Sequence, residues 1–161
     1  MITAVYPGSF DPITLGHMNI IRRAARAFDT VVVLVLANSE KNCTCSIDER
    51  VSLIRKCIED LPNVEVATFS GLLAEYCRTR ENPVIVKGLR AVSDFEYEFQ
   101  MALINNKINP DLETVFLTAA EKYTYLSSSA VRELAKYGAD LSGFVPRQIL
   151  EEVTEKYKRR P

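Results

Sequence analysis

A strict alternation of short apolar runs and helical patterns is the feature that most constrains how this chain can fold. The runs are rich in valine, isoleucine and leucine, which is typical of strands buried on both faces. They cover residues 2–6, 31–36, 64–68, 83–87 and 113–117. Because strands and helices alternate with short connections, we expect right-handed crossovers between parallel strands. The sequence therefore predicts an α/β fold with a doubly wound, five-stranded parallel sheet.

Helical patterns fill the intervals and the C-terminal part of the chain. The clearest helix start is the capping box Ser46-Ile47-Asp48-Glu49, in which Ser46 and Glu49 satisfy each other's backbone N–H groups. Helices are predicted at residues 15–28, 47–61, 72–79, 94–108, 129–136 and 146–157. No repeat or linker interrupts the pattern, so residues 1–161 are predicted to form a single domain that ends in two C-terminal helices.

Charge and hydropathy restrict the partners of the chain. It carries 20 Lys and Arg against 21 Asp and Glu, a net charge of −1, whereas nucleic-acid binders usually carry a positive excess. The first residues lack a signal-peptide pattern, and the longest apolar run, 31–37, is too short to span a bilayer. We therefore expect a cytoplasmic protein with no nucleic-acid and no membrane partner. Its four cysteines are expected to be reduced, and Cys43-Thr44-Cys45 has no second ligand pair that would favour a metal site.

Sheets of this class bind ligands at the carboxyl ends of their strands. Five loops are predicted to meet there, at residues 7–17, 37–45, 69–73, 87–95 and 118–129. The first loop holds the only histidine of the chain, His17, at the start of a helix whose free N–H groups and dipole suit a phosphate. On this local pattern alone, His17 is equally well explained as a histidine satisfied by nearby backbone. Neither G-x-G-x-x-G nor a P-loop occurs.

Four ordered motifs carry a family resemblance. Thr14-Leu15-Gly16-His17 matches the (T/H)-x-G-H signature of the nucleotidyltransferase α/β superfamily. The others are Tyr6-Pro7-Gly8-Ser9-Phe10-Asp11-Pro12, Lys87-Gly88-Leu89-Arg90 with Asp94-Phe95-Glu96-Tyr97-Glu98, and Leu126-Ser127-Ser128-Ser129. In this order, and over essentially the whole chain, they resemble the bacterial phosphopantetheine adenylyltransferase family. The resemblance implies a Rossmann-like fold, a homohexamer, and Mg²⁺ as cofactor. It also implies adenylyl transfer from ATP to 4′-phosphopantetheine, which yields dephospho-coenzyme A and pyrophosphate in coenzyme A biosynthesis.

The resemblance also implies roles for individual residues. Those implied to be catalytic are His17, which would donate to the α-phosphate, Lys41 and Arg90. Those implied to bind the acceptor substrate are Ser9, Lys41, Leu73 and Lys87. Those implied to bind ATP are Ser9, Phe10, His17, Gly88, Leu89, Arg90, Glu98, Tyr123, Thr124, Tyr125, Leu126, Ser127, Ser128 and Ser129. No side chain is implied to ligate the metal, whose ligands would be phosphates and water.

The chain departs from the family at several of these positions. Ser9 stands where threonine is frequent, which keeps the hydroxyl, and Lys87 stands where arginine is frequent, which loses the planar fork for phosphate. Asn42 and Cys43 replace a basic residue and a proline after Lys41. Without the family match, Lys41 would be explained as a solvated loop lysine, and Leu73 is nearly as well explained as a core residue.

The chemistry of the residues agrees with adenylyl transfer. A phosphate acceptor is already ionised at pH 7, so the reaction needs alignment and charge stabilisation but no side-chain nucleophile. The sequence contains no Ser/His/Asp or Cys/His set. Two other functions stay open: a sister nucleotidyltransferase that uses another phosphorylated acceptor, such as nicotinamide mononucleotide or glycerol phosphate, and a nucleotide-sensing or flavodoxin-like binding module.

The predicted helix at 94–108 carries two apolar stripes where a surface helix needs one. They consist of Phe95, Phe99, Ala102 and Leu103, and of Tyr97, Met101, Ile104 and Ile108. The pattern predicts burial against the sheet on one side and against another subunit on the other. A core helix covered by the C-terminal segment would show the same pattern.

Overall fold

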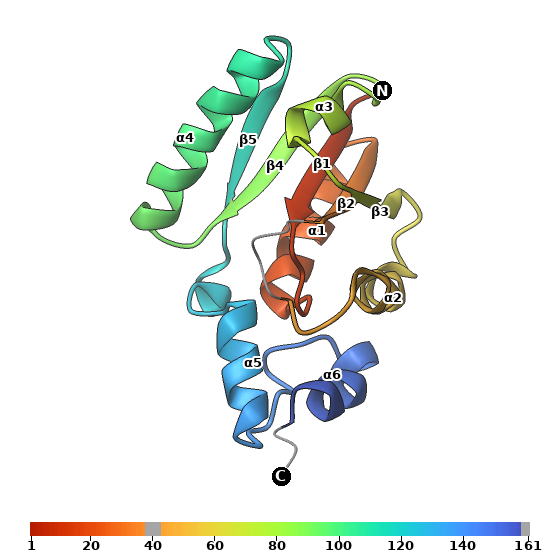
Figure 1. Ribbon diagram of the computed structural model, residues 1–161, viewed down its shortest axis with the longest axis vertical. Helices are drawn as coiled ribbons and strands as arrows, with labels where there is room; N and C mark the ends of the chain where they lie inside the picture. Colours follow the sequence, from red (N-terminus) through yellow and green to blue (C-terminus); the bar gives the residue numbers. More distant parts are fainter. Residues whose placement is uncertain (38–42, 159–161) are drawn as a thin grey trace.

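The computed structural model describes residues 1–37 and 43–158. Five parallel strands form one sheet in the order β3-β2-β1-β4-β5 (Figure 1). They are β1 (Thr3–Gly8), β2 (Thr30–Leu36), β3 (Val64–Phe69), β4 (Pro83–Leu89) and β5 (Glu113–Thr118). The predicted parallel five-stranded sheet is confirmed.

The helices follow the predicted order with shifted ends. They are α1 (Leu15–Ala27), α2 (Ile47–Ile58), α3 (Leu73–Cys77), α4 (Val92–Ile108), α5 (Ser128–Lys136) and α6 (Leu150–Tyr157), with 3₁₀ turns η1 (Glu121–Tyr123) and η2 (Arg147–Ile149). The continuous helix predicted at 146–157 is wrong in its first turn. The backbone of Ile149 leaves the helical conformation (φ −121°, ψ 2°) where its side chain is buried, so η2 and α6 are separate.

Both faces of the sheet are buried, because alternate strand residues belong to two separate clusters. Val5, Val32 and Ile85 pack with residues of α3 on one face. Ala4 and Val33, one position away, pack on the other face with α1, α2 and the C-terminal helices. This period-two alternation explains why the strand sequences are apolar throughout.

The strand order places a crevice beside β1. The chain runs outward from β1 through β2 to β3, then returns to β4 on the other side of β1. The connections that leave β1 and β4 therefore diverge at the carboxyl edge, which is where ligands bind in sheets of this class. In Figure 1 the arrowhead of β1 points toward α5 and α6, which lie beyond that edge.

Helix α4 is the least covered of the long helices. Asn105 is its only buried residue. Phe95, Phe99 and Leu103 are 42%, 47% and 58% exposed, and Figure 1 shows α4 at the outer edge of the molecule beside β4 and β5. The stripe with Tyr97 and Ile104 lines a cavity described below. The stripe that begins at Phe95 touches Phe116 of β5 and is otherwise largely open.

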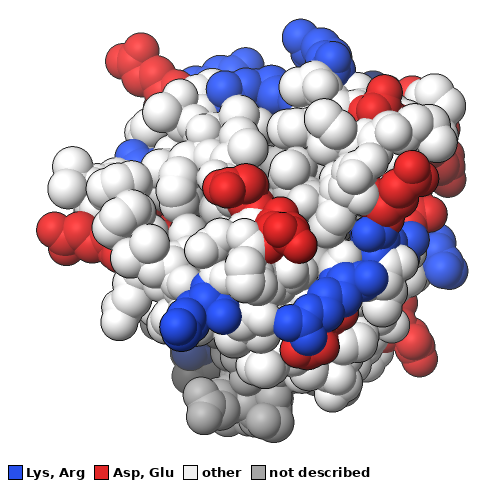
Figure 2. Space-filling model, turned by 90° about the horizontal axis from the view of Figure 1, so that it is seen from above, with Lys and Arg blue, Asp and Glu red and all other residues white. Residues whose placement is uncertain are grey.

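Charged side chains of both signs are mixed on the face of the molecule shown in Figure 2. Some Lys and Arg side chains lie directly against Asp and Glu, and broad uncharged surface surrounds them. Within the described part of the chain, none of the helices has the length and apolar character needed to cross a membrane.

Candidate active site

A cavity of about 490 Å³ occupies the crevice between β1 and β4. The first turn of α1, the end of β4, the first half of α4 and the segment from Ala119 to Ser128 contribute to its walls. Of the residues implied to bind ATP, it brings together His17, Gly88, Arg90, Glu98, Tyr123, Leu126, Ser127 and Ser128. Leu89, Thr124, Tyr125 and Ser129 are adjacent in sequence to these but do not line the cavity.

The hydrogen bonds of His17 determine which ring nitrogen carries its proton. Thr14 is the N-cap of α1, and its side chain accepts from the backbone N–H of His17 at 3.3 Å. In return, the backbone N–H of Thr14 donates to Nδ1 of His17 at 3.0 Å, so the histidine takes the place of the glutamate in a capping box. Because a backbone N–H can only donate, we infer that Nδ1 is the acceptor and that Nε2 carries the proton.

The imidazole of His17 is neutral at pH 7. Desolvation and the nearby positive charge of Arg90 lower the pKa of His17 from 6.5 to about 4. His17 therefore offers the cavity a neutral Nε2–H donor. Backbone satisfaction and a ligand-facing role looked like alternatives in the sequence, but they are compatible here, because the backbone occupies only Nδ1 and the residue also lines the cavity.

Lys87, near the end of β4, and Arg90, just after it, are both paired with carboxylates of α4. Arg90 contacts Asp94 (Nε to Oδ2, 3.2 Å) and donates from Nη1 to the carbonyl of Leu126 at 2.9 Å. Lys87 Nζ lies 3.2 Å from Oε2 and 3.3 Å from Oε1 of Glu98. Asp94 and Glu98 are four residues apart and so lie on one helix face, which explains the spacing of the D-F-E-Y-E motif.

A second cavity of about 370 Å³ adjoins the first and shares Tyr97 and Glu98 with it. It contains three of the residues implied to bind the acceptor: Ser9, Leu73 and Lys87. The rest of its wall is mainly apolar and comes from β1, the loop before α3, and α4. Lys41 and Asn42 lie outside the described residues.

The serines of the fourth motif have three different partners. Ser127 is the N-cap of α5 and accepts from the backbone N–H of Ala130 at 3.1 Å. Ser128 donates its hydroxyl proton to the carbonyl of Pro12 at 2.7 Å. Ser129 accepts from Nη2 of Arg132 at 3.1 Å. One serine therefore caps the helix and another attaches it to the first loop.

Several cavity residues were not anticipated from the sequence. Tyr6, Ile20, Ser93 and Ala119 line the first cavity. Ile20 is three residues after His17, so helical spacing alone could have indicated it. It also explains Gly88, since a Cβ there would lie 2.9 Å from Cγ1 of Ile20. Ser93 and Ala119 lie in the predicted loops 87–95 and 118–129, but nothing in the sequence singled them out within those loops.

Comparison with known proteins first identifies the class of enzyme to which the chain belongs. Residues 5–134 match the sequence profile of the cytidylyltransferase-like family. A crystal structure from Vibrio parahaemolyticus, assigned as a nicotinate-nucleotide adenylyltransferase, has the same fold. It matches with a TM-score of 0.73 and 19% identity, covering 99% of this chain and 96% of that one. The fold and the profile define an enzyme of the nucleotidyltransferase class.

Full-length relatives narrow the class further. Phosphopantetheine adenylyltransferase of Clostridium tetani is 53% identical over 97% of this chain and 98% of its own length. The enzyme of that name from Caldanaerobacter subterraneus subsp. tengcongensis is 54% identical over 99% of each chain. That from Dictyoglomus turgidum is 52% identical over 98% of this chain and 99% of its own. The chain belongs to the phosphopantetheine adenylyltransferase family.

Proposed function

We propose that this chain transfers the adenylyl group of ATP to the phosphate of 4′-phosphopantetheine. The observation that carries the proposal is the pair of adjoining cavities. One contains a neutral histidine donor and Arg90, and the other contains Lys87 in a mainly apolar wall. A nucleotide in the first and a long acceptor with a terminal phosphate in the second would meet near Tyr97 and Glu98, which line both.

The proposed reaction needs no nucleophile from the protein. An oxygen of the acceptor phosphate attacks the α-phosphorus of ATP, and a new P–O bond forms. The bond from the α-phosphorus to the bridging oxygen of the β-phosphate breaks, and pyrophosphate leaves with that electron pair. Negative charge is redistributed over the oxygens around the α-phosphorus, so catalysis depends on alignment and on donors placed there in advance.

His17 and the cations have distinct roles in this proposal. Nε2–H of His17 donates to an oxygen of the α-phosphate, and the guanidinium of Arg90 stabilises the phosphates of ATP. Lys87 binds the acceptor phosphate when that phosphate replaces Glu98 as its partner. Lys41, which the family resemblance assigns to the same phosphate, keeps this role as part of the proposal. Leu73 contacts the pantetheine arm, since it lines the second cavity.

The remaining residues that were predicted to bind ATP fall into two groups, those that surround the nucleotide and those that support the site from behind. Gly88, Leu89, Glu98 and the segment 123–129 surround the nucleotide in the proposal, with Glu98 toward its sugar or base side. Phe10 is 2% exposed and lines neither cavity, so in this proposal it supports the site through the contact of its ring with His17. The side chain of Ser128 is engaged by Pro12, so Ser128 contributes to the site by holding the first loop.

Mg²⁺ is proposed to arrive with ATP, whose phosphate charge it would partly neutralise. Among residues 1–37 and 43–158, no group of three or more His, Cys, Asp and Glu side chains is arranged to hold a metal ion. Oxygen donors suited to Mg²⁺ are present in Asp94 and Glu98, the two carboxylates of the first cavity. This composition fits an ion that phosphates and water would hold.

We further propose that the chain acts as a homohexamer in the cytoplasm. The open apolar stripe of α4 supports an assembly, because contiguous exposed apolar surface of this kind is typical of subunit interfaces. The hexameric number and the compartment rest on the family resemblance and on the expectations drawn from the sequence.

A pyrophosphate-release assay with a panel of acceptors tests the function. We expect turnover with ATP and 4′-phosphopantetheine, and little with nicotinamide mononucleotide or glycerol phosphate. Turnover with one of the latter and none with phosphopantetheine would show a sister nucleotidyltransferase instead. Tight nucleotide binding without any pyrophosphate would show a binding module.

A further inference from the structure

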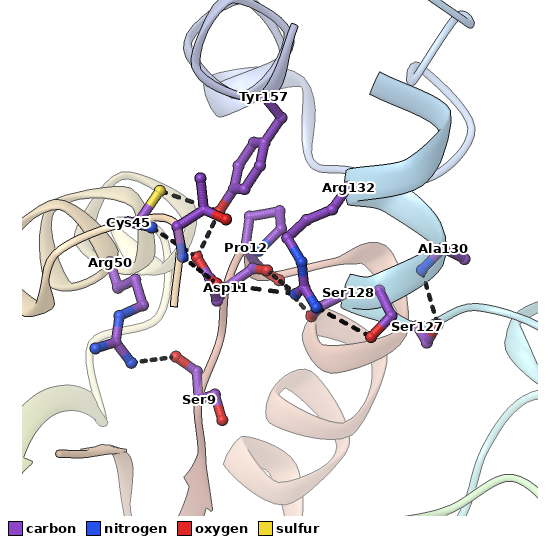
Figure 3. A network of polar contacts seen from close by, with 12 residues as sticks. Ser9, Asp11, Pro12, Cys45, Arg50, Ser127, Ser128, Ala130, Arg132 and Tyr157 are labelled. Atoms are coloured by element: carbon purple, nitrogen blue, oxygen red, sulfur yellow. Dashed lines mark hydrogen bonds and ion pairs between the residues drawn. The ribbon is translucent and has the colours of Figure 1, made fainter. Parts of the chain in front are cut away.

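The loop that follows β1 is anchored by a cluster of side chains and backbone groups from three distant segments (Figure 3). We name this cluster the Asp11 junction. It consists of Asp11 in the first loop, Thr44 and Cys45 before α2, Arg132 of α5 and Tyr157 of α6. Asp11 is 3% exposed, so its carboxylate is satisfied by protein donors.

Each acceptor atom of Asp11 has a specific donor. Oδ1 accepts from the backbone N–H of Cys45 at 3.0 Å and from the Tyr157 hydroxyl at 2.6 Å. Oδ2 accepts from the backbone N–H of Thr44 at 2.8 Å and lies 3.8 Å from Nη1 of Arg132. The carbonyl oxygen of Asp11 accepts from the same Nη1 at 2.6 Å.

The direction of the hydrogen bonds follows from the ionisation of Asp11. Burial raises the pKa of Asp11, but the hydrogen bonds from Tyr157, Cys45 and Thr44 outweigh this effect and the pKa is lowered. An ionised carboxylate only accepts, so the Tyr157 O–H donates to it. The thiol of Cys45, 3.0 Å from the Tyr157 oxygen, therefore donates to that oxygen. Burial raises the pKa of this thiol, which keeps the proton there.

The residue before Asp11 has a backbone conformation that needs such an anchor. Phe10 has a φ of 49°, in the left-handed region that bulky residues rarely adopt. Its ring packs over Gly8, where a Cβ would lie 2.9 Å from Cζ of the ring. Arg50, itself buried, donates to the carbonyl of Ser9 at 2.8 Å. The backbone on both sides of Phe10 is thus held by side chains from other elements.

Phe10 connects the junction to the site. Its ring stands edge-on to the His17 imidazole, with the ring centroids 5.0 Å apart and an interplanar angle of 68°. A small movement of the Asp11 backbone would therefore move the ring that packs against His17.

We propose that Asp11 is a positioning residue for His17, and that Tyr157, in the last helix of the chain, takes part in the catalytic geometry through it. The Asp11 junction fixes the backbone next to Phe10, and the Phe10 ring restrains the imidazole from one side while Thr14 holds its Nδ1. Helix α6 therefore influences the direction of the Nε2–H donor although none of its residues lines either cavity. The kinetic consequences of this proposal depend on the proposed function, whereas its structural consequences do not.

Two variants and one matched control test the proposal. Asp11→Asn keeps the shape of the side chain but removes its charge, and Tyr157→Phe removes a single donor. Tyr137→Phe makes the same change at a tyrosine that is 70% exposed. Because His17 is the only histidine, its imidazole NMR signals can be followed without assignment, and Phe10 should shift them by its ring current.

We expect Asp11→Asn to lower kcat by about a hundredfold, as small misplacements of catalytic groups do. Tyr157→Phe should lower kcat by roughly fivefold, the factor given by one hydrogen bond. In both variants the KM for ATP changes less than kcat, and the His17 signals move at temperatures where the protein is folded. Tyr137→Phe leaves both readouts unchanged.

The proposal is overturned if folded Tyr157→Phe protein keeps the parent kcat and the parent His17 signals. A lowered melting temperature with an unmoved imidazole would also overturn it, since that outcome shows a purely structural role. If the Asp11→Asn variant does not fold, the result for Tyr157→Phe tests the proposal by itself. If the parent protein shows no adenylyl transfer, the proposed function fails, but the NMR comparison still tests the positioning.

Discussion

Helices α1 and α4 border the same cavity but are held in very different ways. Helix α1 is amphipathic: Met18, Ile21 and Ala24 are buried on one side, and its start is closed by the reciprocal cap between Thr14 and His17. Helix α4 has Asn105 as its only buried residue and no side-chain cap, and it exposes large apolar side chains along most of its length.

The difference separates the site into two halves. The half that carries His17 is fixed by contacts within one chain. The half that carries Asp94 and Glu98 belongs to a helix whose outer stripe of Phe95, Phe99 and Leu103 is open in the single chain. A second copy of the chain that covers this stripe would restrain the carboxylates that pair with Arg90 and Lys87. Assembly and activity should therefore be coupled through α4 and not through α1.

The largest expected effect concerns the α1 half. His17→Ala removes the Nε2–H donor, so turnover should fall by roughly a hundredfold or more, the usual scale for one transition-state donor. ATP affinity should fall much less, and assembly should not change. Steady-state kinetics and nucleotide titration measure the two effects. Asn19→Ala, two residues further along α1, is the control, and parent-like kinetics of the His17 variant would contradict the assigned role.

The next effect concerns the α4 half. Leu103→Glu places a charge in the open apolar stripe, so the protein should dissociate into smaller species. Turnover should fall by about tenfold, because even small misplacement of groups at the site is costly. Sedimentation or light scattering measures the size, and pyrophosphate release measures the activity. Ser52→Glu on the exposed side of α2 introduces the same charge elsewhere and should change neither. A Leu103→Glu variant that dissociates but keeps full activity would contradict the expected coupling between assembly and activity.

A smaller effect is expected where α4 meets β4. Glu98→Gln removes the counter-ion of Lys87, so the acceptor phosphate no longer has to displace a carboxylate. The KM for phosphopantetheine should fall by about threefold, the value of a partly exposed ion pair. Asp94→Asn is the matched variant for Arg90 and should change the KM for ATP without changing that for phosphopantetheine, whereas Glu98→Gln can change both because Glu98 lines both cavities. Equal effects of both variants on both substrates would show that the pairs are not specific.

The smallest expected effect concerns the pH dependence of His17, which should not change its protonation near neutral pH. The folded-state pKa of His17 is about 4, below its ordinary value of 6.5. Between about pH 4 and pH 6.5 the unfolded chain therefore binds a proton more readily than the folded protein does. The free energy of unfolding should fall as the pH drops from about 6.5 to about 4, and His17 should not affect it above pH 6.5. NMR of the single histidine should show no midpoint between pH 6 and 8, and a midpoint near 6.5 would refute the neutral donor.

The elements of the fold could be predicted because their signals are local. Periodicity placed all five strands, and the capping box placed the start of α2. The first turn of the last helix was wrong, because only tertiary packing shows that Ile149 is buried in a non-helical conformation. Four of the five loops that were expected to meet at the carboxyl edge, 7–17, 69–73, 87–95 and 118–129, contribute residues to the two cavities. The fifth, 37–45, contributes none of its described residues, and residues 38–42 lie outside the described part of the chain.

The pairings inside the site could not be predicted in the same way. Ser128 looked like one of three equivalent serines, but its partner is Pro12, 116 residues away. Asp11 meets Tyr157 across 146 residues. Such contacts leave no periodic trace in the sequence, because they depend on how the C-terminal helices dock against the first loop.

Local chemistry alone determined the parallel sheet, the edge at which ligands bind and the residue types gathered there, because side-chain periodicity and cap preferences act within a few residues. The tertiary structure decided how far the pKa of His17 is lowered, which carboxylate pairs with Lys87, and what anchors the first loop. Those properties depend on burial and on contacts of about 3 Å between separate elements, and both exist only once the chain has folded.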